Sequence, residues 1–305
     1  MTSFRCAAAS LARAEPIAGT ATHVRTWLLL EHVGPWGNTA LLDARLPDGL
    51  GAALRDRAQE LRAKILLIRR VSSRPSTPYG VRVFAAYADP LRPRLESGVV
   101  GDPRDVLDLD LGALRRGGST GLPAYDGPLF CVCTNGRHDA CCAERGRPVA
   151  AALDAAHPEH TWEVSHIGGD RFAANLVVLP HGLYYGRLDP AAALTVADSH
   201  RDGLLTLDLL RGRASYPMPV QAAEIALRRE LGLLGLAAVE LVDRSVADEV
   251  TTVDLAAGGA IYRVRVRTTR DSGDTAQLTC KASRPNPVPS HEVLGIEPLP
   301  PAAEQ

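Results

Sequence analysis

The chain has 305 residues, of which 46% are hydrophobic and 23% charged, so it is long enough for two or three globular domains. Its formal net charge of −1 and its lack of any basic run argue against nucleic acid and anionic membrane as general partners. No apolar stretch approaches the roughly 18 residues that cross a bilayer, and no signal-peptide core follows Arg5. We therefore expect a cytoplasmic protein without a membrane span.

The first 125 residues have an α/β pattern. The apolar run Thr26–Glu31 predicts a strand, and the helical spacing of apolar residues in Leu50–Ala63 predicts a helix. Two β-rich runs follow, Lys64–Ile68 and Val81–Tyr87, with a Ser/Pro/Gly-rich turn between them. Leu107–Leu114 predicts a short helix before a linker rich in Gly and Pro.

From Leu129 a similar order begins again. The predicted elements are a strand at 129–132, a helix at 143–155, strands at 161–165, 175–179 and 183–188, and a helix that starts at Pro190. This β-α-β-β-α order is that of a thioredoxin-like sheet. The first domain could be a diverged copy of it that has no cysteines.

The last part predicts a helix at Pro217–Leu234 and three strands, Thr251–Leu255, Ala260–Thr268 and Thr275–Lys281. We expect the last two strands to pair across a polar turn at 270–274, and the tail after Pro285 to be extended. The predicted class is α/β, with an α/β domain over 1–125, a thioredoxin-like ferredoxin domain over 126–215, and an α+β element over 216–305.

Cysteine spacing gives the first specific signal for function. The six cysteines are Cys6, Cys131, Cys133, Cys141, Cys142 and Cys280. Four of them fall between positions 131 and 142. A secreted disulfide framework would be smaller and would spread its cysteines more evenly, whereas a tight cluster in a cytosolic chain favours metal or redox chemistry.

The residues around this cluster resemble the first half of thioredoxin-like ferredoxins. The run V-C-T-N-G-R contains Cys133, and Cys142 precedes an A-E-R-G step into the predicted helix. Further on, H-I-G-G-D at 166–170 stands where those ferredoxins carry their second pair of cysteines. It is followed by V-V-L-P and then by G-L-Y-Y-G. The whole pattern resembles the sucrase/ferredoxin-like family.

This resemblance implies a [2Fe–2S] cluster with Cys133, Cys142 and His166 as ligands. Eukaryotic members of the family have H-x-G-G-H, with a histidine where this chain has Asp170, so Asp170 is the expected fourth ligand. His181 or a spare cysteine are the alternatives. Zinc is the alternative metal, because two thiolates, an imidazole and a carboxylate also suit it.

Strand and helix geometry indicates which of the spare cysteines could serve as an alternative ligand. Cys131 stands two positions before Cys133 on a strand, so both side chains leave the same face. Cys141 and Cys142 are neighbours on a helix and diverge by about 100°, which disfavours binding of one small cluster by both. Gly168 and Gly169 would allow the backbone to approach and hydrogen-bond the cluster.

We therefore expect an iron–sulfur protein for electron transfer or redox sensing, with an unidentified redox protein as its partner. A zinc-stabilised or metal-free interaction protein is the first alternative. A thiol–disulfide oxidoreductase is the second, although the chain lacks C-x-x-C. No G-x-S-x-G elbow, phosphate loop or carboxylate pair supports a sucrase or another hydrolase.

Overall fold

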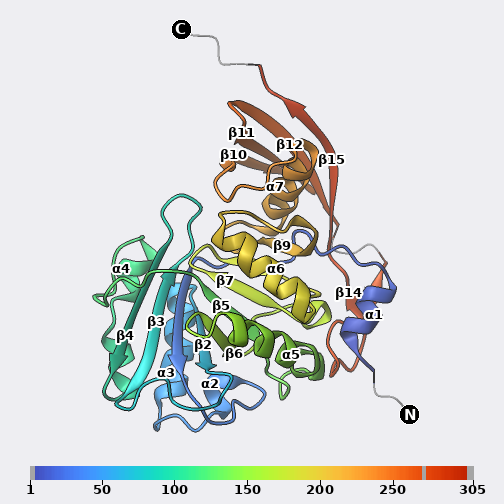
Figure 1. Cartoon of the computed structure of the whole chain (residues 1–305). Helices are drawn as coiled ribbons and strands as arrows, with labels where there is room; N and C mark the ends of the chain where they lie inside the picture. Colours follow the sequence, from blue (N-terminus) through green and yellow to red (C-terminus); the bar gives the residue numbers. More distant parts are fainter. Residues whose placement is uncertain (1–3, 270–272, 301–305) are drawn as a thin grey trace.

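The computed structural model describes residues 4–269 and 273–300. It confirms the predicted α/β class: helices cover a large curled sheet, and a smaller sheet follows toward the C-terminus (Figure 1). Within the described ranges, no helix has both the length and the apolar character needed to span a membrane.

A nine-stranded sheet forms the body of the protein. Its strands are β1 (Thr26–Glu31), β2 (Lys64–Arg69), β3 (Val81–Tyr87), β4 (Arg94–Val100), β5 (Leu129–Cys133), β6 (Thr161–Val164), β7 (Leu176–Leu179), β8 (Leu183–Tyr185) and β9 (Leu210–Arg213). They lie in the order β4-β3-β1-β2-β6-β5-β7-β8-β9.

Seven α-helices and three short 3₁₀ segments accompany the strands. The α-helices are α1 (Cys6–Ala12), α2 (Ala40–Asp43), α3 (Leu50–Leu61), α4 (Leu111–Arg115), α5 (Ala140–Ala156), α6 (Pro190–Arg201) and α7 (Met218–Leu231). The 3₁₀ segments are η1 (Pro103–Asp108), η2 (Asp170–Phe172) and η3 (Leu207–Leu209). These counts refer to the described residues.

The two halves of the large sheet have the same connections. Helix α3 joins the parallel pair β1 and β2, and α5 joins the parallel pair β5 and β6; in each half two antiparallel strands follow. The halves meet where β2 and β6 pair antiparallel, and Arg69 and Glu163 form an ion pair of 2.6 Å across this seam. The repeated order predicted from the sequence is therefore present.

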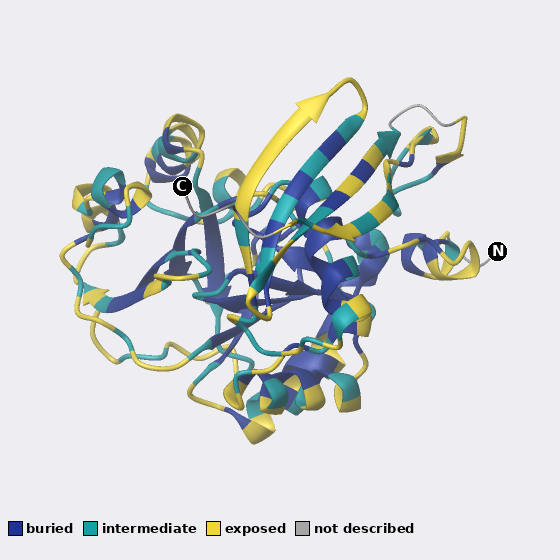
Figure 2. Ribbon diagram, turned by 90° about the horizontal axis from the view of Figure 1, so that it is seen from above, coloured by how far each residue is buried: buried dark blue, intermediate teal, exposed yellow. Residues whose placement is uncertain are grey.

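The sheet is curled around one apolar core. Trp27 and Phe84 of the first half share this inner cluster with Cys131 and Trp162 of the second half. Alternate residues of the same strands face outward, where α3 and α4 cover the first half and α5 and α6 the second. The central strands are consequently buried on both faces (Figure 2).

The C-terminal part forms a separate four-stranded sheet. Its strands are β10 (Val239–Ala247), β11 (Val250–Ala257), β12 (Ala260–Thr269) and β15 (Ser290–Pro298), in the order β10-β11-β12-β15. One face packs on α7, and burial alternates along β11 accordingly (Figure 2). Two short strands, β13 (Thr275–Ala276) and β14 (Asn286–Pro287), pair with each other.

Two predictions about elements were wrong, and a third was incomplete. The strand expected at Thr275–Lys281 ends at Ala276 and does not pair with β12, because β15 takes that place. Within the tail after Pro285, Ser290–Pro298 is extended as predicted, but it also pairs with β12 as β15, which was not predicted. The helix expected at Leu107–Leu114 is split in two, because Asp102 caps η1 and Asp110 caps α4. The turn expected at 270–274 falls largely outside the described residues.

Candidate metal centre

The ends of three elements bring Cys133, Cys142 and His166 together. Cys133 is the last residue of β5, Cys142 lies in the first turn of α5, and His166 follows β6 by two residues. Because β5 and β6 are parallel neighbours, their carboxyl ends meet at one edge of the sheet, and α5 starts there. One possible ligand atom from each of the three residues lies within 4.8 Å of the other two.

Asp170, the fourth predicted ligand, adjoins this group. The Cys142 thiol donates to Oδ1 of Asp170 at 3.2 Å, and His166 Nδ1 lies 2.9 Å from the same oxygen. The Asp170 carboxylate is 3% exposed, whereas the His166 ring is 27% exposed. The thiols and the carboxylate therefore form the inner wall of the site, and the imidazole reaches its rim.

A second imidazole, His138, lies at the same rim. Its ring stacks on His166 with 3.6 Å between ring centroids and 20° between planes. Its Nδ1 is 3.1 Å from the Asn38 carbonyl oxygen, and its Nε2 is 3.7 Å from Asp170 Oδ2. If Nδ1–H donates to that carbonyl, Nε2 keeps a free lone pair directed toward the site. The sequence gave no sign of this stacking.

The charges of these groups depend on each other. Hydrogen bonding from Cys142 holds the pKa of Cys133 well below its ordinary value, against the effect of burial. The same contact, together with burial, raises the pKa of Cys142. Burial disfavours charge on His166 and Asp170 as well, yet each favours charge on the other: the pKa of His166 rises to about 9 and that of Asp170 falls. This anion-rich pocket is suited to a cation.

A buried arginine supports the loop that carries His166 and Asp170. The Arg211 guanidinium donates to the Gly168 carbonyl at 3.0 Å and to Asn175 Oδ1 at 2.9 Å. Gly169 has a φ of +79°, and a Cβ there would lie 2.3 Å from Arg211 Nη2. Of the two glycines predicted to lie close to the cluster, Gly169 thus also makes room for this cation and Gly168 accepts a hydrogen bond from it. The sequence analysis did not identify Arg211 as part of the site.

Buried polar atoms without a hydrogen-bond partner in the described part of the chain indicate that this pocket could hold a metal group. His166 Nδ1 is buried, and despite the close carboxylate it completes no hydrogen bond with any residue that the structure describes. Thr134 Oγ1 and Asn135 Nδ2, in the two residues directly after Cys133, are also buried and have no hydrogen-bond partner among the described residues. An imidazole nitrogen without a hydrogen-bond partner is what a [2Fe–2S] group with a histidine ligand would use.

The alternative ligands lie elsewhere. Cys131 shares the apolar inner core with Cys133 and Cys142 but belongs to none of the candidate metal-ligand groups among the described residues, and burial raises its pKa. Cys141 lies with Cys6 and Cys280 in another group. His181 follows β7, and its ring contacts His200 at 5.0 Å between centroids.

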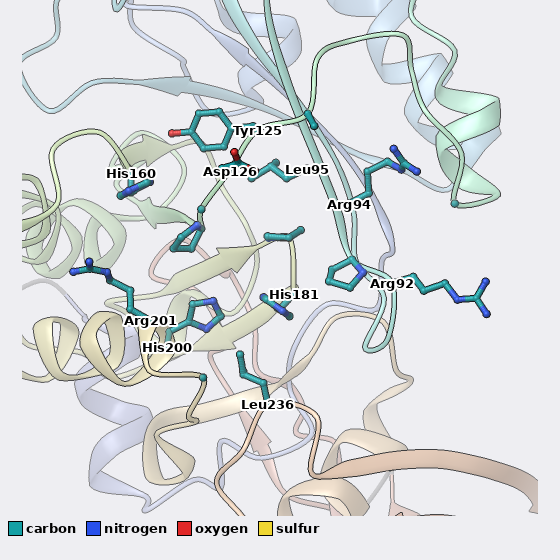
Figure 3. A pocket seen from close by; sticks show the side chains of 17 residues that line it. Arg92, Arg94, Leu95, Tyr125, Asp126, His160, His181, His200, Arg201 and Leu236 are labelled. Atoms are coloured by element: carbon teal, nitrogen blue, oxygen red, sulfur yellow. The ribbon is translucent and has the colours of Figure 1, made fainter.

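His181 lines an open cleft of 1160 Å³ that lies away from the metal centre. Figure 3 shows His181 and His200 near each other there, with His160 and Tyr125 on the same cleft. Pro128, before β5, and Pro180, after β7, also line it, whereas Cys133 ends β5. The cleft is thus at the opposite end of β5 from the metal centre.

Comparison with known proteins gives one match. A family model described as sucrase/ferredoxin-like matches residues 17–212, which is 196 of the 305 residues. The matched range includes Cys133, Cys142, His166 and Asp170, but neither Cys6 nor Cys280. Comparisons with curated proteins and with solved structures gave no match.

Proposed function

The chain belongs to the sucrase/ferredoxin-like family, and we propose that it is an electron-transfer or redox-sensing protein with a [2Fe–2S] cluster. Cys133, Cys142, His166 and Asp170 would hold the cluster. The meeting of these four side chains at the ends of β5 and β6 carries the proposal. When bound, the cluster would accept and release one electron.

The residues around the site divide its tasks. Cys133 and Cys142 are buried, so they exclude water from the sulfur side. His166 and His138 are about a third exposed and stack at the rim, which gives the shortest route between the site and a partner. An imidazole at this position can also exchange a proton when the charge of the site changes.

The surface beside the site favours an acidic redox partner. A pocket of 430 Å³ next to Cys133 is lined by Trp36, by Arg137 and Arg147, and by Arg69, whose charge is offset by Glu163. Positive charge at the point of electron exit would orient a partner that carries carboxylates. We place the pair in the cytoplasm, where thiol ligands stay reduced.

A single zinc ion is the second candidate for this site. The observation that favours it is the spacing of Cys133, Cys142 and His166, whose ligand atoms all lie within 4.8 Å. Against it, His138, His166 and Asp170 form a second such group that shares only His166 with the first. Two adjoining groups of donors suit the two metal atoms of a [2Fe–2S] cluster better than a single zinc ion, which takes four ligands in structural sites.

The test is anaerobic purification of the full chain, with iron and sulfide analysis, visible absorption, and EPR after reduction. We expect two irons and two sulfides per chain, with the cluster lost in Cys133→Ser and Cys142→Ser. Cys131→Ser is the matched control, because it removes a buried thiol of the same strand. Colourless protein that holds zinc and no iron would overturn the proposal in favour of the second candidate.

A further inference from the structure

A second group of metal-ligand side chains lies on the other side of the start of α5. Cys6, at the first residue of α1, meets Cys141 and Cys280, and the Asp139 carboxylate completes the group. One ligand atom from each lies within 4.8 Å of the others. The four residues come from three segments that are far apart in the chain, and Figure 1 shows α1 beside the β14 region.

Three of the six distances between the ligand atoms are close to the edges of a tetrahedron around one ion. Cys141 Sγ and Cys280 Sγ are 3.4 Å apart, and Cys280 Sγ and Cys6 Sγ are 3.6 Å apart. Zinc–sulfur bonds of about 2.3 Å require sulfur atoms about 3.8 Å apart in a tetrahedron. Cys6 Sγ is 3.7 Å from both oxygens of Asp139, near the sulfur–oxygen edge of about 3.5 Å that zinc would require.

The carboxylate is held in place for this role. Oδ1 of Asp139 accepts from the Cys141 backbone N–H at 2.9 Å, and Oδ2 accepts from the Cys280 N–H at 2.6 Å. Each carboxylate oxygen has a second lone pair for a metal. Asp139 is fully buried, and none of the described arginine or lysine side chains forms an ion pair with it. A buried carboxylate beside three thiols lacks a compensating cation.

We propose that Cys6, Asp139, Cys141 and Cys280 form a structural zinc site. Three thiolates and one carboxylate are ligands that zinc accepts in closed tetrahedral sites, and binding would release the thiol protons. The ion would fasten α1 and the Cys280 segment to the first turn of α5. This group shares no residue with the cluster site, and two of its members, Cys6 and Cys280, lie outside the range matched by the family model.

The test measures zinc and iron separately in the full chain. Wild-type protein, reconstituted anaerobically with Zn²⁺ and dialysed, should retain one zinc per chain besides any iron. Cys6→Ser and Cys280→Ser should each lose that zinc and keep the visible spectrum of the cluster. Cys133→Ser should keep that zinc and lose the visible spectrum of the cluster, and Cys131→Ser should change neither metal.

A cobalt titration of the wild-type protein tests the proposal even if the cysteine variants fail to fold. Wild-type protein treated with Co²⁺ should develop intense thiolate-to-cobalt absorption and tetrahedral d–d bands at one equivalent, in Cys133→Ser as well. Absence of these bands, or zinc retained in both Cys6→Ser and Cys280→Ser, would overturn the proposal. A disulfide found among these cysteines by mass spectrometry after anaerobic alkylation would overturn it too.

Discussion

The charge of Asp170 makes a direct prediction about the reduction potential. Asp170→Asn keeps the shape of a side chain that is 3% exposed and lies 2.9 Å from His166 Nδ1 and 3.2 Å from Cys142 Sγ. It removes one negative charge at the metal centre. Because reduction adds an electron, loss of a nearby negative charge makes it easier, and the potential should rise.

The size of the rise follows from counting charges. A [2Fe–2S]²⁺ core with two thiolates, one imidazole and one carboxylate carries 1−, and the amide would make it neutral. Plant-type clusters, at 2−, lie near about −400 mV, and neutral Rieske centres at roughly −150 to +300 mV. One charge therefore corresponds to roughly 125–350 mV. Because the His166 ring is 27% exposed, we expect the lower part of this range.

The assay is a redox titration followed by visible absorption and EPR, with iron analysis to show that the cluster is intact. Glu96→Gln is the control, since it removes a buried carboxylate on β4, outside the metal centre. An unchanged potential in intact Asp170→Asn would refute the assignment of Asp170. Loss of the cluster in His138→Asn at the same time would make His138 the fourth ligand.

Three further predictions concern stability, measured by urea unfolding. Gly169→Ala should lower the free energy of unfolding by clearly more than Gly203→Ala, for which backbone strain alone should cost roughly 1 kcal/mol. The reason is that the new Cβ meets Arg211 at position 169 but no neighbouring atom at position 203, and equal losses in the two variants would contradict this. Glu224→Gln should cost about 3–5 kcal/mol, since it leaves two buried arginines without their carboxylate; a loss below 1 kcal/mol would count against the ion pairs. Burial lowers the pKa of His200 to about 3, so below pH 6.5 this histidine is protonated in the unfolded state but stays neutral in the folded state. At pH 5 the free energy of unfolding should therefore be about 2 kcal/mol lower than at pH 7.5 because of His200. His200→Gln should remove this difference between the two pH values, and a variant with the same pH dependence as the wild type would refute the role of His200.

Local patterns were enough for several buried strands of the fold, although the buried β9 was not predicted. The bounds of β1 and β3 agree with the predicted runs, because each run is apolar and bounded by polar or turn residues. Strands β4 and β15 were missed for the opposite reason. Arg94–Val100 and Ser290–Pro298 contain charged residues and glycine, so their strand form depends on pairing with β3 and β12.

The candidate site shows the same division. Cys133, Cys142 and His166 carry a motif that could be read along the chain, and the structure brings them within 4.8 Å. The contacts of His138 and Arg211 could not be read in this way. The stacking of His138 on His166 requires β5 and β6 to be neighbours, and Arg211 reaches Gly168 from β9, 43 residues away.

The vicinal cysteines now have a physical explanation. Neighbouring residues at the start of a helix point about 100° apart, and the first turn of α5 uses this to serve two sites. Cys142 faces Cys133 and Asp170, whereas Cys141 faces Cys280. A disulfide between Cys141 and Cys142 would have to remove one ligand from each site. Under the two proposals above, each of the adjacent cysteines therefore serves a metal site of its own.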